Sequence, residues 1–420
     1  MLTAPIRATT HLLVVTSAAC LIGAVSGLTS WALFEALDHA TTLRLDHTWL
    51  VWLLPVAALT LGSAYHYFGG ASNGGTSLVI EQSLPPRDAT AAQQVPEVPY
   101  RMAPMIFGAT FIAQLTGASV GREGAALQIS GSVTSLLTRP FRLRPSDTRL
   151  MLIAAMAGAF GGAFGVPLAG AIFGLEVQQT GRLRYEGLAP ALAASITADL
   201  IVESLGRHTP MVNIPINIDW SIALRLVLVG IAAGLAARLF IEVLHGVKKT
   251  ISDLISWVPG RPVIGALATL ALMLIFGRDY LGLSLPLVEQ ALGGSVASWW
   301  DPVLKILFTA IALGCAIPGG EVTPLFVVGA TLGSAMSGPL HLSPTLTAAA
   351  CLAAVFGAAA NAPIACAVLA IELFGADMAI PAGIVCIVAY AISPKHGIYE
   401  GQRHGSTKDL RATAVQPHRS

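Results

Sequence analysis

Apolar residues along the chain gather into stretches that short polar connections separate. The stretches cover residues 11–37, 49–68, 102–119, 123–138, 149–165, 167–178, 186–204, 219–245, 262–277, 302–316, 324–337, 345–360, 363–374 and 379–392. Several are shorter than the roughly 20 residues that a helix needs to cross a bilayer. Half-length helices that meet near the midplane are typical of secondary transporters and channels. The pattern predicts an all-α polytopic membrane protein with broken and half-length helices.

The composition supports this prediction and narrows the function classes. Hydrophobic residues make up 54% of the chain and charged residues only 11%, whereas soluble domains carry about 25% charged residues. The net charge of +1 gives no reason to expect nucleic acid as a partner. The five cysteines lie in apolar stretches without metal-type spacing, and no HExxH or phosphate-loop motif occurs. We therefore expect no enzyme activity, no metal site and no cofactor.

The polar connections carry most of the positive charge. The first apolar stretch follows Arg7 and is too long for a signal peptide, so it predicts a first membrane-spanning helix. By the positive-inside rule, these connections and the basic tail are expected on the cytoplasmic side. They comprise residues 84–101, 139–149 with Arg139, Arg142, Arg144 and Arg149, 246–261 with Lys248, Lys249 and Arg261, and the tail from Lys395.

An internal repeat divides the chain into two halves. Residues 165–176 match residues 361–372, and the glutamates that end them, Glu176 and Glu372, lie 196 residues apart. A Gly-rich acidic element precedes each copy. Two halves with the same order of parts predict a duplicated fold with the binding site between them. The two glutamates are expected only to cap or pair at helix ends, and the residues leave parallel and inverted repeats both open.

The first acidic element is Gly121-Arg122-Glu123-Gly124. A charged side chain at the membrane centre costs roughly 2.5–3.5 kcal/mol, so these charges need a protein, water or ion partner. The glycines allow close approach of main-chain N–H groups, and the helix that follows presents an anion site at its N-terminus. Glu123 would occupy that site and leave it when protonated, which predicts a gate. The alternative is an ion pair with Arg122 that only fixes the helix end.

The second acidic element is Gly319-Gly320-Glu321-Val322-Thr323-Pro324, where Glu321 lies 198 residues after Glu123. It also precedes a helix, and Pro324 is compatible with the first helical turn. We expect Glu321 to carry protons near the ion path and Thr323 to offer its hydroxyl to that path. The alternatives are a first-turn acid that satisfies the helix dipole and a simple N-cap.

Two further polar residues are weaker candidates. Thr76, in Gly74-Gly75-Thr76-Ser77, begins a short apolar segment, so its hydroxyl either faces an anion or caps a short helix. Tyr399 follows the last apolar stretch. Its phenol either faces the same pathway or lies in the interfacial aromatic belt, and the residues alone favour the belt.

Taken together, these motifs resemble the CLC family of chloride channels and anion/proton antiporters over about residues 10–405. Gly121-Arg122-Glu123-Gly124 matches the family's GREG element, and residues 149–176 are similar to its next two helices. The resemblance implies a transmembrane domain, residues 1–405, of two inverted repeats, about 10–205 and 215–405, followed by a short cytoplasmic tail, 406–420. It also implies a multi-pass homodimer in the lipid of the inner membrane, with an anion pathway in each subunit.

The resemblance also implies roles for individual residues. Glu123 matches the family's external gating glutamate, Thr76 falls at its pore serine and Tyr399 at its pore tyrosine. The rest of the expected anion pathway comprises Gly121, Arg122, Gly124, Val322 and Thr323. Glu321 is the expected second proton carrier.

Three departures from the family pattern refine the implied function. The family's GSGIP element is absent, its GxFxP element reads Gly320-Glu321-Val322-Thr323-Pro324, and Val177 replaces a proton-carrying glutamate of chloride exchangers. These departures are similar to the bacterial fluoride/proton antiporters, which implies proton-coupled export of fluoride. The alternatives are a transporter of chloride or another anion and a passive anion channel. Fluoride is strongly hydrated, so close N–H and O–H donors would have to replace its water.

Overall fold

The computed structural model describes residues 3–85, 97–141, 143–207, 212–215, 218–394 and 396–403, with side chains from residue 11 onward. Arg142, Lys395 and the predicted tail 406–420 lie outside the described residues. The regular structure of the described part is helical, and its extended pairing is confined to two isolated bridges.

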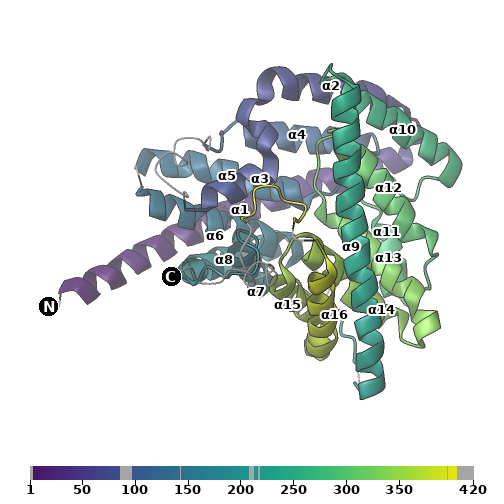
Figure 1. The fold of residues 1–420 in the computed structure, drawn as a ribbon. Coiled ribbons are helices and arrows are strands. Elements are labelled where there is room, and N and C mark those ends of the chain that lie inside the picture. The colour runs from purple at the N-terminus through teal and green to yellow at the C-terminus, as the bar shows by residue number, and fades with distance from the viewer. Residues whose placement is uncertain are drawn as a thin grey trace, which may run out of the picture.

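The described residues of the first half form eight α-helices, the longest of which is the N-terminal helix that crosses the left of Figure 1. They are α1 (Thr3–Asp46), α2 (Leu54–Ala64), α3 (Gly75–Ser83), α4 (Met102–Leu115), α5 (Glu123–Thr138), α6 (Pro145–Phe164), α7 (Pro167–Glu176) and α8 (Leu188–Ser204). Proline begins α6 and α7, where the missing N–H removes no helical hydrogen bond.

The second half repeats this arrangement with a long helix followed by shorter ones (Figure 1). The elements are α9 (Trp220–Leu254), α10 (Gly260–Phe276), α11 (Leu285–Leu292), α12 (Trp300–Gly314), α13 (Val322–Leu340), α14 (Pro344–Ala359), α15 (Pro363–Phe374) and α16 (Ala379–Ile392). Proline again begins the helices that match α6 and α7, namely α14 and α15.

The observed helices confirm most of the predicted apolar stretches and differ from the prediction in three places. The stretch 49–68 is not one helix, because a 3-10 turn precedes α2 and a π turn follows it. The predicted connection 246–261 is helical up to Leu254, since its lysines lie on an exposed face where charge does not oppose helix formation. Helix α11 was not predicted, because its eight residues are too few to form a recognisable apolar stretch.

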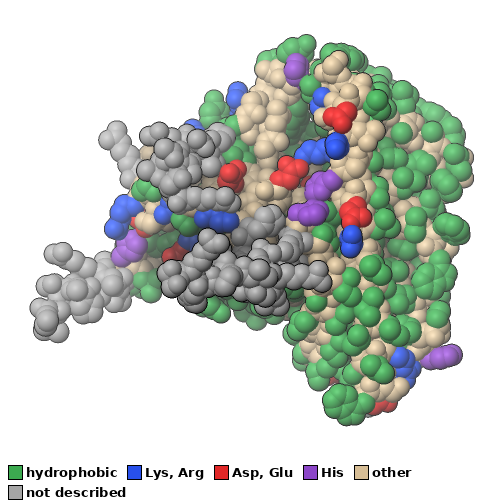
Figure 2. All heavy atoms as spheres, in the orientation of Figure 1, with side chains coloured by type: hydrophobic (Ala, Val, Ile, Leu, Met, Phe, Trp, Pro, Cys, Tyr) green, Lys and Arg blue, Asp and Glu red, His purple; other side chains and the backbone are tan. Residues whose placement is uncertain are grey.

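The outer surface of the described part suits a bilayer. Four helical segments there are long and apolar enough to cross a membrane, covering residues 11–46, 48–83, 185–204 and 220–254. The shorter apolar helices include α4, α7, α10, α14 and α15. Figure 2 shows hydrophobic side chains over much of the surface on the α10 to α14 side, whereas charged side chains and histidines gather near α9. This distribution agrees with the predicted membrane protein.

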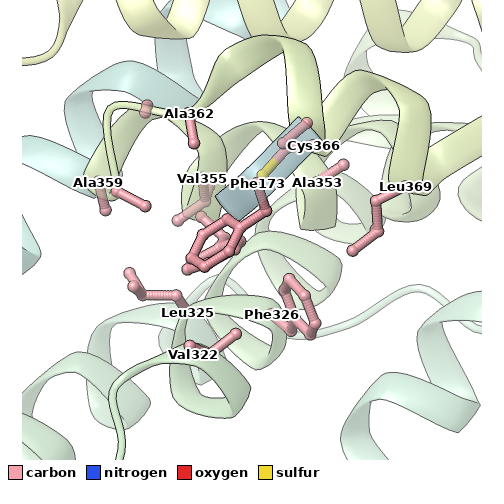
Figure 3. Packing of buried hydrophobic residues seen from close by; sticks show 14 of the residues in the cluster. Phe173, Val322, Leu325, Phe326, Ala353, Val355, Ala359, Ala362, Cys366 and Leu369 are labelled. Carbon is pink, nitrogen blue, oxygen red and sulfur yellow. The ribbon is translucent and has the colours of Figure 1, made fainter. Parts of the chain in front are cut away.

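The core interlocks the two halves. Figure 3 shows Phe173 of α7 among residues of α13, α14 and α15, including Val322, Val355 and Cys366. Helices α13 and α14 approach closely, since a side-chain Cβ at Gly333 would lie 2.1 Å from the Thr347 carbonyl oxygen. Small residues at helix contacts allow such packing in membranes, where apolar burial alone does not drive association.

Reciprocal contacts relate the halves by an approximate two-fold axis. The Glu176 carboxylate at the end of α7 accepts the N–H groups of Ile364 and Ala365 at the start of α15, at 3.2 and 2.8 Å. In return, the Glu372 carboxylate at the end of α15 accepts N–H groups at the start of α7, at 3.0 and 2.7 Å. Each glutamate therefore caps the helix of the other half, which agrees with the predicted capping role.

Candidate functional site

The two Gly-rich acidic elements meet at the centre of the molecule. The Gly121 N–H donates to the Gly320 carbonyl at 2.6 Å, and the Gly320 N–H donates back to the Gly121 carbonyl at 2.9 Å. A Cβ at Gly320 would lie 2.8 Å from the Gly124 nitrogen. Glycine is therefore required for this close main-chain pairing. The pairing brings the N-termini of α5 and α13 together.

Glu123 lies at this junction, but at a different helix from the one expected. Its side chain is 3% exposed. One carboxylate oxygen accepts the Thr323 N–H at 3.1 Å, the Thr323 hydroxyl, and the Arg122 N–H at 3.3 Å. The carboxylate thus occupies the N-terminus of α13, whereas the sequence predicted the N-terminus of its own helix. Side chains at the first helical position point back past the helix end, and the neighbouring half supplies the donors there.

Arg122 is only partly engaged by Glu123. Its Nε lies 3.5 Å from the second Glu123 oxygen, whereas its Nη1 donates to Asp38 on α1 at 2.8 Å. Asp38 also accepts from Arg207 at 2.7 Å, and the Arg122 guanidinium lies 4.3 Å from the ring centroid of Phe34. The principal ion pair of Arg122 is therefore with α1. Asp38 could not be recognised as a partner from the sequence, because it follows the first apolar stretch and lies 84 residues from Arg122.

Glu321 occupies the N-cap position of α13, with no side-chain capping hydrogen bond. It is partly exposed and lines a cavity of about 810 Å³. Thr76 and Tyr399 line the same cavity, so three residues predicted from distant parts of the chain come together there. No side-chain capping hydrogen bond supports the alternative in which Glu321 only caps α13.

Gly124 lies beside both Thr76 and Glu321. A Cβ at Gly124 would lie 3.5 Å from Glu321 Oε2 and 3.7 Å from Thr76 Oγ1, and only 2.9 Å from Gly320 Cα. The Thr76 hydroxyl is buried and lies 3.4 Å from the Gly124 carbonyl oxygen. It does not cap α3, because the N-cap there is Gly74.

Tyr399 and Val322 complete the predicted residues. Tyr399 is 3% exposed and its hydroxyl has no hydrogen-bond partner among the described residues. Such burial contradicts the position in an interfacial aromatic belt that the residues alone favoured, because the chain folds back over the cavity after α16. Val322 is fully buried as the first residue of α13. A buried donor without a partner is costly, so the Tyr399 hydroxyl is available to a ligand in the cavity.

The cavity wall also carries charge near α9. Lys248 Nζ donates to a Glu400 carboxylate oxygen at 2.6 Å, and both side chains are more than half exposed. The hydrogen bond from Lys248 holds the pKa of the Glu400 carboxyl below its usual range, although partial burial opposes this. His245 lies at the same wall, and its ring centroid is 6.1 Å from that of His396. Figure 2 shows this grouping of histidine and charged side chains along α9.

Gln128 is among the polar residues of the cavity that sequence reasoning did not identify as part of the site. Gln128 on α5 lines it and donates from Nε2 to Thr76 Oγ1 at 3.3 Å. The available signal was a lone amide in the apolar stretch after Glu123. No group of three or more metal-binding side chains occurs among the residues that were described.

Known proteins share the sequence pattern of this chain. The profile of the family described as "Voltage gated chloride channel" matches residues 57–394. A curated relative, the "Chloride/fluoride channel protein" of Pseudomonas syringae pv. tomato, is 40% identical over 402 residues, covering 93% of this chain and 86% of that protein.

Solved structures agree with these sequence relatives. The crystal structure of a CLC-type fluoride/proton antiporter superposes with a TM-score of 0.88 at 28% identity, covering 94% of this chain and 98% of that chain. A slow cyanobacterial Cl⁻/H⁺ antiporter shares the fold, with a TM-score of 0.75 at 17% identity, covering 90% of this chain and 94% of that one. These matches confirm the predicted all-α fold.

Proposed function

The chain belongs to the voltage gated chloride channel family, and from this premise we propose that it exchanges fluoride for protons across the membrane. Members of this family are channels or transporters, so the prediction that the chain is not an enzyme is confirmed. One observation carries the proposal: the Glu123 carboxylate takes the donors at the N-terminus of α13 that an anion would need.

Competition for those donors couples the proton to the anion. The ionised Glu123 carboxylate accepts from the Thr323 N–H and hydroxyl. A protonated carboxyl is a weaker acceptor, so protonation favours its departure and lets an anion take the same donors. Loss of the proton returns the carboxylate and expels the anion. Each cycle therefore needs a proton at Glu123 before an anion passes.

Glu321 is the second proton carrier in this proposal. It faces the cavity, whereas Glu123 is sealed within the protein. Each glutamate lies close in the chain to one of the two paired glycines, Gly121 and Gly320. Val177, which is fully buried at the end of α7, cannot carry a proton. A proton from the cavity would therefore reach Glu123 by way of Glu321.

The donors around the cavity support fluoride as the anion. Thr323 offers an N–H and a hydroxyl, while Thr76 and Tyr399 offer hydroxyls from the cavity wall. Hydroxyl and N–H donors can replace part of the hydration that a small anion loses on entry. The names of the Pseudomonas relative and of the antiporter with a TM-score of 0.88 include fluoride, which also supports this assignment.

The proposal extends to location and assembly. We place the protein in the inner membrane as a multi-pass homodimer, by analogy with its family. Exposed apolar residues on α8 and α16, such as Leu200 and Ile387 at 57 and 65%, suit either lipid or a partner subunit. Mass measurement by light scattering in detergent, with the detergent mass subtracted, tests the dimer; a monomeric mass would contradict it.

Ion efflux from liposomes that hold the purified protein tests the function. Liposomes are loaded with fluoride or chloride in parallel, and efflux is followed together with proton uptake by a pH-sensitive dye. Fluoride efflux with matching proton movement and little chloride efflux is expected. Comparable chloride efflux would replace fluoride specificity with a general anion exchanger, and anion efflux without proton movement would indicate a passive channel.

A further inference from the structure

Gln128 is a buried amide whose position the gate mechanism above does not explain. It lies on α5, five residues after Glu123, with 7% of its surface exposed. Its carboxamide lies beside the start of α3, where a Cβ at Gly75 would be 3.5 Å from Gln128 Nε2. A buried amide group is costly without hydrogen-bond partners, and among the described residues Gln128 pairs with the Thr76 hydroxyl.

The direction of this hydrogen bond determines what the Thr76 hydroxyl can do. Gln128 Nε2 donates to Thr76 Oγ1 at 3.3 Å, so Thr76 is the acceptor there. A threonine hydroxyl has only one proton to donate. Thr76 donates this proton to the Gly124 carbonyl oxygen at 3.4 Å, well beyond the usual O–H···O distance of about 2.7–2.8 Å. The proton is therefore weakly held and available to a better acceptor.

A suitable space lies next to that proton. Glu321 Oε2 and Thr76 Oγ1 both lie within 4 Å of the point where a Gly124 side chain would begin. Both residues line the cavity together with Gln128. An anion that enters this part of the cavity comes within reach of the Thr76 hydroxyl and of a protonated Glu321. Small anions gain most from such short, directed donors.

We propose that Gln128 is a positioning residue for anion selectivity, which holds Thr76 as a hydrogen-bond acceptor so that its hydroxyl proton is directed at the anion. This inference rests on the proposed transport function. It adds that Gln128 orients the Thr76 hydroxyl, the donor that meets the anion. Gln128 acts through Thr76. Without the Gln128 amide, the Thr76 hydroxyl can rotate toward other acceptors, including Glu321. The consequence is weaker binding of small anions relative to larger ones.

A double-mutant cycle tests the inference. Gln128→Met keeps the side-chain length but removes the donor, and Thr76→Val keeps the shape but removes the hydroxyl. Fluoride and chloride binding are measured by calorimetry on the full-length protein in detergent. Gln128→Met is expected to weaken fluoride binding about fivefold, as for the loss of one hydrogen bond, and to lower the fluoride-to-chloride preference. In the Thr76→Val background the same change should have no further effect.

The chain provides a matched control. Gln114 is also buried, and its Nε2 donates to the Thr41 hydroxyl at 3.0 Å, outside the residues that line the cavity. Gln114→Met removes the same kind of hydrogen bond elsewhere and should leave the fluoride-to-chloride preference unchanged. If Gln128→Met weakens binding equally with and without the Thr76 hydroxyl, or if Gln114→Met shifts the preference as much, the inference is overturned.

A second variant covers the case in which Gln128→Met folds poorly. Gln128→Glu keeps the shape but reverses the hydrogen bond when ionised, because a carboxylate only accepts. It should weaken fluoride binding more than Gln128→Met at neutral pH and recover at low pH, where a protonated carboxyl can donate again. A pH-independent loss would contradict the inference. The double-mutant cycle could also show coupling between Gln128 and Thr76 in a protein that binds chloride but not fluoride. That result would retain the inference about Gln128 and overturn the proposed fluoride specificity.

Discussion

The N-termini of α5 and α13 are two versions of one structural unit. The reciprocal hydrogen bonds between Gly121 and Gly320 make these two glycines equivalent under the two-fold relation. The N-cap residues that follow are Arg122 and Glu321, and Glu123 and Val322 begin the helices. Glu321 is therefore shifted by one residue from the position equivalent to Glu123, which Val322 occupies.

This shift explains why the two glutamates face different surroundings. The first helical position points into the protein in both halves, since Glu123 is 3% exposed and Val322 is fully buried. The N-cap position points outward, where Arg122 contacts Asp38 and Glu321 faces the cavity. The duplication thus supplies two similar helix ends, and the choice of residue at two adjacent positions places a buried carboxylate at one, the proposed gate, and an accessible acid at the other.

The substitution Glu123→Gln should have the largest effect, because it removes the titratable group from the start of α5. Glutamine has no proton to exchange and is a weaker acceptor for the Thr323 donors, so we expect proton movement to fall to the leak of empty liposomes while anion flux continues. The measurement is paired anion efflux and proton uptake in liposomes. Normal proton-coupled exchange in this variant would show that Glu123 is not the gate.

Glu321→Gln should have a smaller effect of a different kind. The gate stays intact, but its proton supply from the cavity is removed, so fluoride efflux should fall by about tenfold, or about 1.4 kcal/mol in activation free energy. Efflux at several pH values measures this loss. Wild-type rates throughout would reduce Glu321 to a structural acid at the start of α13.

The other duplicated pair sharpens the comparison, because Glu176 and Glu372 have kept the same role. Replacing either with Gln weakens charge-assisted hydrogen bonds to a helix start, worth about 1.5–3 kcal/mol. Glu176→Gln should destabilise more, since Glu176 is 4% exposed and Glu372 is less buried. Thermal unfolding in detergent measures both. Unequal changes in proton coupling, with unchanged stability, would contradict a shared capping role.

The smallest expected effect is on stability, at the ion pair between Lys248 and Glu400 on the cavity wall. Lys248 holds the pKa of Glu400 below its usual range, so the pair contributes stability at neutral pH that disappears as the pH falls through this lowered pKa. Both side chains are exposed, and such pairs contribute about 0.2–1 kcal/mol. Unfolding of wild type and Glu400→Gln across the acidic range measures the difference. A difference that grows as the pH falls would contradict this pairing.

The sequence by itself determined most of the helices and the polar residues expected at the site. Apolar stretches gave α5, α15 and α16 with their observed bounds. Glycines beside Glu123 and Glu321 marked two helix starts that could receive an anion. This worked because hydropathy and helix-end chemistry are local properties, readable over a few residues.

Only the tertiary structure decided which groups meet. Glu123 accepts from Thr323 rather than from its own helix, and Gln128 contacts Thr76 across 52 residues. Lys305 is fully buried on α12, where its Nζ lies within hydrogen-bond distance of oxygens of Ser119, Tyr280, Gly282 and Ser284. Such partners come from segments far apart in the chain. Their pairing depends on how the two halves pack, because a buried polar group takes its partner from whichever segment the fold brings beside it.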